Sequence, residues 1–210
     1  MGKIALIILL TLPAAVANAQ DDQLVSKGNE LYKKQQFDKA ADEYRKAAGL
    51  NDKNPQAHYN LGNALYKNKK AEDAEKAYEV AADKSKDAPG KSRALYNKGV
   101  ALTRQKKLEE SINAYKQTLR LNPVDEEARQ NLQKALNELK KQPPQPQPKD
   151  DKKQQDKKQD NKQPEPEKNN SKLNKKQVDQ MLNALRQDEK KLQQELQKKS
   201  NTSGSNRKDW

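Results

Sequence analysis

Residues 58–81, HYNLGNALYKNKKAEDAEKAYEVA, decide the fold of this 210-residue chain, because the same pattern occurs again on both sides of them. The glycine of this stretch, Gly62, has counterparts 34 residues before it and 37 residues after it. Glycine, small and aromatic residues recur at fixed offsets: Gly28, Gly62, Gly99; Leu31, Leu65, Leu102; Ala40, Ala74, Ser111; Tyr44, Tyr78, Tyr115; Ala47, Ala81, Thr118. A period near 34 residues is typical of helical hairpins that bury their apolar faces only against neighbouring copies.

Each copy has the pattern of two short helices, so the sequence predicts an all-α chain. We expect three helical hairpins over residues 21–54, 55–91 and 92–125, followed by a capping helix over 126–141 with one apolar face. The three extra residues of the middle copy should lie in a loop over 83–91, which contains a proline and a glycine.

The composition argues against an enzyme or a metal protein. The chain has no cysteine and one histidine, His58, which leaves no thiolate or histidine cluster for a metal ion and no nucleophile–base pair. We therefore expect no catalytic residue, no cofactor and no small-molecule substrate, and we interpret His58 as a packing residue. The net charge of +13 does not indicate nucleic-acid binding, because the lysines alternate with acidic and amide residues and lack accompanying aromatic residues.

The N-terminus carries a targeting signal. Lys3, the apolar run 4–12 and the small residues Ala17 and Ala19 are typical of a secretory signal peptide over 1–19, cleaved near Ala19–Gln20. The mature protein would then be periplasmic or lie on the periplasmic face of the cell envelope. An uncleaved membrane anchor is the less favoured alternative, because the run is short for a bilayer.

The C-terminal third contains a linker, a helix and a tail. Residues 142–172 have no apolar side chain other than proline and predict a disordered linker. Residues 173–199 predict an isolated amphipathic helix with Asn174 as N-cap and Gln177 three residues on, followed by a flexible tail over 200–210. We expect this helix to need a partner or, alternatively, to fold back onto the repeats. Its short coiled-coil-like stripe and the terminal tryptophan predict an interaction surface: Val178, Met181, Leu182, Leu185, Leu192, Leu196 and Trp210.

The period and the glycine, small and aromatic positions resemble the tetratricopeptide repeat, which implies a helical-hairpin solenoid of three repeats plus a capping helix. In that family glycines at these positions let the first helix of each hairpin approach the second, where the facing small residues would be Ala40, Ala74 and Ser111. The first helices of the family line a concave groove that binds proteins. Mapped by position, the groove consists of Val25, Asn29, Tyr32, Lys33, Tyr59, Asn63, Tyr66, Lys67, Arg93, Tyr96, Val100 and Arg104, with Thr103 and Gln130 beside them. Its tyrosines would either contact a partner or pack between neighbouring helices.

Some relatives in this family hold a partner's terminal carboxylate with five side chains. Three of those positions match in this chain: Asn29, Asn60 and Arg93. The other two, Val25 and Asn97, stand where the family needs a basic residue. The resemblance therefore implies anion capture by Arg93 with Lys67 and Arg104 rather than a complete clamp.

The motifs at 173–177 and Lys208-Asp209-Trp210 resemble the small repeat protein of Bacteroidetes Bat (aerotolerance) gene clusters. That resemblance implies a stress-related envelope complex with von Willebrand A-type membrane proteins as partners and a MoxR-type ATPase across the membrane. The sequence thus favours an exported adaptor without enzymatic activity. The alternative is an envelope-assembly scaffold, peripherally associated with the membrane, that binds anionic lipid or cell-wall polymer through its lysines.

Overall fold

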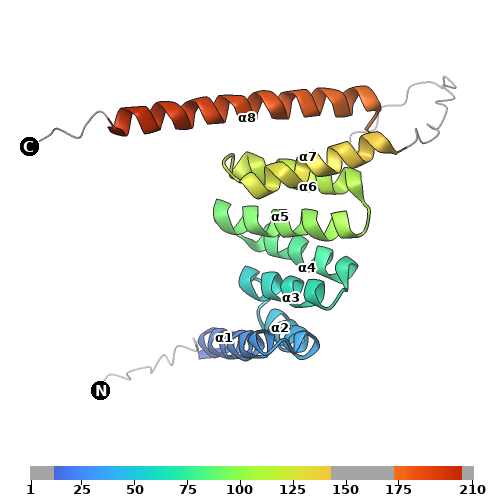
Figure 1. Cartoon of the computed structure of the whole chain (residues 1–210). Coiled ribbons are helices and arrows are strands. Elements are labelled where there is room, and N and C mark those ends of the chain that lie inside the picture. Colours follow the sequence, from blue (N-terminus) through green and yellow to red (C-terminus); the bar gives the residue numbers. More distant parts are fainter. Residues whose placement is uncertain (1–11, 143–172, 205–210) are drawn as a thin grey trace, which may run out of the picture. The chain divides into compact units, whose positions relative to one another are not determined.

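The structure is a computed structural model that describes residues 12–142 and 173–204, with only the backbone described at 12–19, 196 and 199–204. Within these segments all regular secondary structure is helical and forms eight helices (Figure 1). The predicted all-α class is therefore confirmed. The apolar run before residue 12, most of the predicted linker and the end of the tail with Trp210 lie outside the described residues.

Six helices pair as three hairpins that follow one another along the chain. The hairpins are α1 (Leu12–Lys33) with α2 (Phe37–Leu50), α3 (Pro55–Lys67) with α4 (Ala71–Lys84), and α5 (Ala88–Arg104) with α6 (Leu108–Leu121). Each second helix contacts the first helix of the next hairpin, and α3 contacts both α1 and α5 (Figure 1). The first helices of the hairpins therefore lie side by side and form one surface.

A tyrosine ring lies on a glycine in every hairpin. A Cβ atom added to the glycine would lie only 2.5–2.6 Å from a ring carbon in three pairs: Gly28 with Tyr44, Gly62 with Tyr78, and Gly99 with Tyr115. The three tyrosines are at most 3% exposed. The three atoms nearest to a Cβ at each glycine belong to the tyrosine ring, which therefore lies closer than the small residues expected there (Ala40, Ala74 and Ser111).

The turn inside each hairpin has the same geometry three times. Its central residue has a positive φ in each case: 57° at Gln35, 63° at Lys69 and 62° at Lys106. The next amide donates to the carbonyl of a leucine five residues earlier, at 2.9–3.0 Å, from Gln36 to Leu31, from Lys70 to Leu65 and from Lys107 to Leu102. This is the hydrogen bond that ends a helix in a Schellman motif.

The three extra residues of the middle copy form helix and not a loop. Helix α4 continues to Lys84, and α5 begins at Ala88 with Asp87 as its N-cap; the Asp87 carboxylate accepts the Gly90 N–H at 2.7 Å. Helix α5 consequently has 17 residues, whereas α3 has 13. The predicted loop over 83–91 is reduced to residues 85–87, because an aspartate cap followed by a proline in the first turn is a helix start.

Helix α1 begins inside the segment predicted as a signal peptide. It runs without a break past Ala19–Gln20. The residue that corresponds to Pro55, the first residue of α3, is Asp21, so residues 12–20 extend α1 beyond the repeat. Among the described residues, none of the helices combines the length and the apolar character needed to span a membrane.

Two helices follow the hairpins, and the chain divides into two compact units at Ala135. Helix α7 (Glu126–Lys141) buries the apolar side chains Ala128, Leu132, Ala135 and Leu136. Helix α8 (Lys175–Gly204) extends beyond the predicted end at residue 199. Its predicted start is confirmed, since Asn174 and Gln177 exchange hydrogen bonds of 2.8 and 2.9 Å. Within the second unit, Lys140 pairs with Asp179 at 2.6 Å.

Candidate functional site

All twelve predicted groove residues lie on α1, α3 and α5. Their aromatic and aliphatic side chains are half-buried, whereas every charged one is exposed. The half-buried residues are Val25, Tyr32, Tyr59, Asn63, Tyr66, Tyr96 and Val100, and the exposed ones are Asn29, Lys33, Lys67, Arg93 and Arg104. Rings that are anchored but still accessible, beside free cationic groups, are suited to protein recognition.

A ladder of amide hydrogen bonds crosses this face between the repeats. In the first two repeats, the asparagine that follows the glycine accepts one hydrogen bond from the buried tyrosine of its own hairpin and another from an asparagine of the next. The donors are Tyr44 (2.7 Å) and Asn60 (3.1 Å) for Asn29, and Tyr78 (2.9 Å) and Asn97 (3.3 Å) for Asn63. The ladder fixes neighbouring repeats to each other and aligns their polar groups.

The third repeat departs from this ladder. Val100 takes the place of the asparagine, and Thr103 takes the place of the tyrosine found four residues after the glycine in the other repeats. The Thr103 Oγ1 lies 3.0 Å from the Tyr115 hydroxyl, so the threonine satisfies the buried hydroxyl that asparagine satisfies elsewhere. Asn131 of α7 donates instead to the Tyr96 hydroxyl at 3.0 Å. The third repeat therefore lacks the ladder asparagine of the first two, and its groove tyrosine is bonded from α7.

The groove tyrosines pack on other side chains through part of their surface. The Tyr59 and Tyr78 ring centroids are 5.9 Å apart, and the guanidinium of Arg104 lies 5.1 Å from the centre of the Tyr66 ring. Arginine stacked on an aromatic ring stays charged while its position is restricted. The tyrosines thus contribute to packing and retain an accessible edge.

Burial keeps the phenol groups neutral. It raises the pKa of Tyr44 and of Tyr96 to about 12, and it raises the pKa of Tyr32, Tyr78 and Tyr115 above the ordinary value as well. At physiological pH these hydroxyls therefore carry no charge, and the charge of the groove comes from its lysines and arginines.

Helices α3 and α5, which form the groove face, differ in charge from α4, which lies between them in the chain. Neither α3 nor α5 contains an aspartate or a glutamate, while α5 alone has four lysines and arginines. Helix α4, the second helix of the middle repeat, has five acidic residues. Because Lys98 of α5 pairs with Glu79 of α4 at 2.9 Å, the exposed cations of the groove face on these two helices are Lys67, Arg93 and Arg104. This part of the face is complementary to an acidic ligand.

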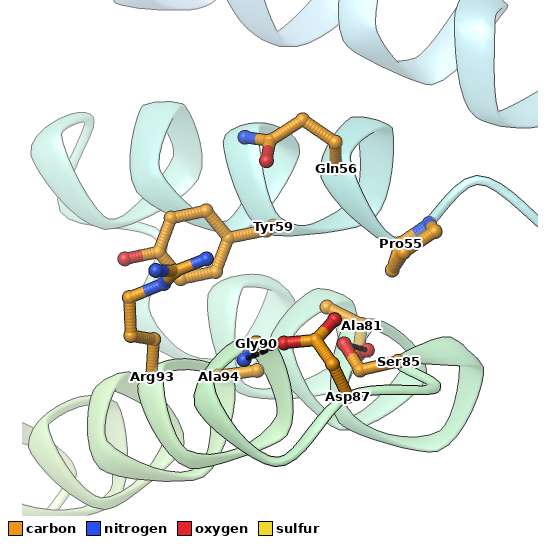
Figure 2. Close-up of a pocket in the computed structure, with 9 residues that line it drawn as sticks. All are labelled: Pro55, Gln56, Tyr59, Ala81, Ser85, Asp87, Gly90, Arg93 and Ala94. Atoms are coloured by element: carbon orange, nitrogen blue, oxygen red, sulfur yellow. Dashed lines mark hydrogen bonds between the residues drawn. The ribbon is translucent and has the colours of Figure 1, made fainter.

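A pocket adjoins this face where α3, α4 and the start of α5 meet (Figure 2). Figure 2 shows Arg93 projecting from α5 toward the Tyr59 ring of α3, with Asp87 and Gly90 at the start of α5. The lining residues are Pro55, Gln56, Tyr59, Ala81, Ser85, Asp87, Gly90, Arg93 and Ala94. Only Tyr59 and Arg93 were predicted as site residues. The helix-start pattern from Asp87 to Gly90 is the sequence signal that could have revealed Asp87 and Gly90.

The remaining predicted residues occupy mixed environments. Asn29 and Asn60, two of the matches to the carboxylate clamp, are bonded to each other, and Arg93, the third, lies at the pocket. His58 is 9% exposed, with its Nε2 3.1 Å from the Asp52 carbonyl oxygen, which fits a packing role. Within the described parts of the chain, no three acidic or histidine side chains gather to hold a metal ion.

The predicted C-terminal interaction surface is partly covered. Val178, Leu182 and Leu185 are buried, while Met181 and Leu192 are half-buried. The side chains of Leu196 and Trp210 lie outside the described residues. Helix α8 therefore offers less free apolar surface than its sequence predicts.

Comparison with known families and structures agrees with this architecture. Residues 28–69 match the family model for the TPR repeat, and residues 54–123 match that for the tetratricopeptide repeat. No curated protein matches the chain. The first TPR domain of Spaghetti (RPAP3), solved with the HSP90 peptide SRMEEVD, is 29% identical with a TM-score of 0.54, over 58% of this chain and 94% of that one.

Two further solved structures share the fold. The second TPR domain of human RPAP3, in complex with the HSP70 peptide SGPTIEEVD, is 25% identical with a TM-score of 0.53, over 57% of this chain and 97% of that one. The Arabidopsis OM64 TPR domain is 22% identical with a TM-score of 0.54, over 58% of this chain and 98% of that one. Residues 28–123 of this chain are tetratricopeptide repeats.

Proposed function

We propose that this protein is an adaptor whose groove binds an extended acidic segment of another protein. Tetratricopeptide repeats mediate protein–protein interactions. The observation that supports an acidic ligand is the charge of the groove helices. Helices α3 and α5 together present half-buried tyrosines and exposed arginines, and neither helix contains an acidic residue. An acidic segment would gain electrostatic attraction and aromatic contact on the same face.

The amide ladder supplies the polar part of this recognition. The side-chain oxygens of Asn29 and Asn63 accept hydrogen bonds within the ladder, which leaves their NH₂ groups as donors. Main-chain carbonyls of an extended segment are suitable acceptors. Because the ladder holds these asparagines in place, little side-chain entropy is lost when the segment binds.

The solved relatives support the acidic class of ligand. The two RPAP3 domains were solved with peptides that both end in Glu-Glu-Val-Asp. In the present chain, Arg93 and Arg104 are exposed cations on the corresponding face and would pair with such carboxylates.

Selection from a displayed library of random heptapeptides on the full-length chain tests this proposal. We expect enrichment of aspartate and glutamate. The double variant Arg93→Gln with Arg104→Gln should weaken binding of the selected peptides about tenfold, since two charge-assisted contacts are lost. The matched control, Lys116→Gln with Arg120→Gln, removes the same charge from α6 and should leave affinity within about twofold. Enrichment without acidic preference, or equal losses in both variants, would contradict the proposal.

We further propose that the adaptor works in the cell envelope after export. Lys3, the apolar run 4–12 and the small residues before Gln20 support a cleaved signal peptide. The C-terminal motifs support a Bat-type stress-related complex, with von Willebrand A-type membrane proteins as partners and α8 with its tail as the second contact. N-terminal sequencing of the protein from an envelope fraction should give Gln20, and crosslinking in cells should capture membrane proteins of that class. A chain that retains Met1 in the cytoplasm would exclude export.

The net charge of +13 also favours a scaffold that binds anionic lipid or cell-wall polymer. Salt separates the two functions, because lysine-driven surface binding weakens steeply as the Debye length shortens, while desolvated groove contacts persist. Sedimentation with vesicles containing anionic lipid at about 50 and about 150 mM salt distinguishes them.

A further inference from the structure

The pocket beside Tyr59 lies where the middle hairpin meets α5, and the residues there differ from those at the two equivalent junctions, between the first hairpin and α3 and between the third hairpin and α7. Pro55 begins α3 and lines the pocket. At the corresponding position of the first repeat, Asp21 is 1% exposed and its carboxylate accepts hydrogen bonds from Asn51 (2.8 Å) and Asn54 (3.1 Å). A polar side chain thus fills the first junction.

The third junction is filled in a different way. Ser92 corresponds to Pro55, is 3% exposed and donates to the carbonyl oxygen of Thr118 at 3.4 Å. Thr118 itself corresponds to Ala81, which lines the pocket. The middle junction has proline and alanine at these two positions, with no hydrogen-bonding side chain on one and only a methyl group on the other. Neither residue fills the space beside Tyr59.

The chemistry of the lining is apolar inside and charged at one edge. Pro55, Ala81, Ala94 and the ring of Tyr59 give apolar surface, and Arg93 is exposed beside them (Figure 2). The carboxylate of Asp87 caps α5 by accepting a hydrogen bond from the Gly90 N–H, and its negative charge faces the start of that helix. The guanidinium of Arg93 is therefore the group available to an incoming charge.

The volume sets the size of the occupant. The pocket measures about 80 Å³. A cavity of about 150 Å³ holds benzene, and a water molecule takes about 30 Å³ in the liquid. The pocket thus has room for three or four carbon atoms, which is the size of a branched aliphatic side chain.

We propose that this pocket seats one branched aliphatic side chain of the partner segment, with an adjoining carboxylate of that segment paired to Arg93. The inference rests on the proposed acidic-segment binding and adds a specificity determinant to it. The partner would carry a valine, leucine or isoleucine next to an acidic residue. The pocket at the middle junction would supply this specificity.

The test uses isovalerate, which combines a branched aliphatic group with a carboxylate, and acetate, which has the carboxylate alone. Each salt is titrated at constant ionic strength into the ¹⁵N-labelled full-length chain while the amide signals of Gly90 and Ala94 are followed by NMR. We expect saturable shifts with isovalerate and at least about fivefold weaker binding of acetate, because the buried methyl groups are missing.

Two variants introduce into the pocket the residues found at the corresponding positions of the first and third repeats. Ala81→Thr introduces the residue of the third repeat, and Pro55→Asp introduces that of the first. Each should reduce isovalerate affinity at least about fivefold through lost apolar contact. If one of them lowers the urea midpoint, the other provides the comparison. Arg93→Gln should weaken isovalerate but leave the neutral probe 3-methylbutan-1-ol unchanged.

Equal shifts with acetate and isovalerate, or isovalerate binding that survives both closing variants, would overturn the inference. Isovalerate reports on the pocket alone, so such a failure would leave the acidic peptide selection intact. Conversely, a library that shows no acidic preference would contradict the groove proposal, while the isovalerate result would still decide whether the pocket binds aliphatic groups.

Discussion

The interior contacts of the three repeats are nearly identical, whereas their groove faces differ. A Cβ added to the glycine would lie 2.5 Å from the tyrosine ring in the first hairpin and 2.6 Å from it in the other two, and the hairpin turns share one backbone geometry. On the groove, the third repeat replaces asparagine by Val100 and tyrosine by Thr103, and a pocket is open at the middle junction.

This difference indicates which residues maintain the fold and which determine recognition. A contact that every repeat must make tolerates little change, because each hairpin buries its apolar face through it. A position on the open face can vary without loss of packing. We therefore expect substitutions at the repeated contacts to change the free energy of unfolding and substitutions on the groove to change mainly affinity.

The largest effect should come from Gly62→Leu. A side chain at Gly62 would collide with the Tyr78 ring, since even a Cβ would lie 2.6 Å from it. We expect a loss of about 3 kcal/mol in the free energy of unfolding, measured by urea denaturation. Gly49→Leu is the matched control, because nothing lies within 4 Å of a Cβ there. Similar midpoints for the two variants would contradict the glycine–ring contact.

A smaller effect should follow from Tyr78→Phe, which keeps the ring and removes the hydroxyl that donates to Asn63 at 2.9 Å. Loss of one buried hydrogen bond should cost about 1 kcal/mol. Tyr115→Phe should cost a similar amount although its partner is Thr103 and not asparagine. A loss confined to Tyr78→Phe would mean that the threonine does not replace the asparagine of the ladder.

A stabilisation of about 0.5 kcal/mol should result from Lys69→Gly. Lys69 has a φ of 63°, where a side chain is strained and glycine is not, although glycine also gains entropy in the unfolded chain. Thermal unfolding should show a slightly raised midpoint. The same change at Lys76, inside α4, should lower it by a comparable amount. Lowered midpoints in both variants would contradict the assigned turn.

The smallest effect at neutral pH should come from Glu43→Ala, which gives the first repeat the alanine that the others have at Ala77 and Ala114. Glu43 is 7% exposed, and its Oε1 accepts from Lys46 at 3.0 Å and from Lys27 at 3.2 Å. Burying a charge offsets most of what these pairs contribute, so we expect a change below about 1 kcal/mol at pH 7.

The pH dependence gives a sharper comparison at this position. The hydrogen bond from Lys46 is the main cause that holds the pKa of Glu43 below its ordinary value. The contribution of the ionised carboxylate is therefore present above about pH 4.3 and is lost as the pH falls through the lowered pKa of the folded state. Urea denaturation between pH 3 and 7 should show the wild type losing stability relative to Glu43→Ala on acidification. A constant difference would contradict the lowered pKa.

The sequence predicted the parts of this structure that recur. The 34-residue period identified the hairpins and, with the family resemblance, the helices of the groove. The reciprocal cap of α8 followed from Asn174 and Gln177 alone. Periodicity works here because each copy repeats the same burial pattern.

Other features depend on how the copies meet and could not be predicted from the period. The tyrosine lies on the glycine because of the way the two helices of a hairpin pack. The ladder pairs Asn29 with Asn60, which are 31 residues apart and thus off the repeat spacing. The first turn of α5 contains Pro89 and Gly90, whose residue types favour a loop. The start of the helix depends on one capping hydrogen bond, which the Gly90 N–H donates to the Asp87 carboxylate.

The extended start of α5 shows how a repeat can gain residues while its interior contacts stay the same. Residues added before the start of a helix do not change the direction in which the later side chains of that helix point. Gly99 and Leu102 therefore still face the interior of their hairpin. The added turn projects only at the rim, where it supplies Asp87 and Gly90 to the pocket. Helix beginnings are thus positions at which insertions can introduce new recognition chemistry while the inherited interior is preserved.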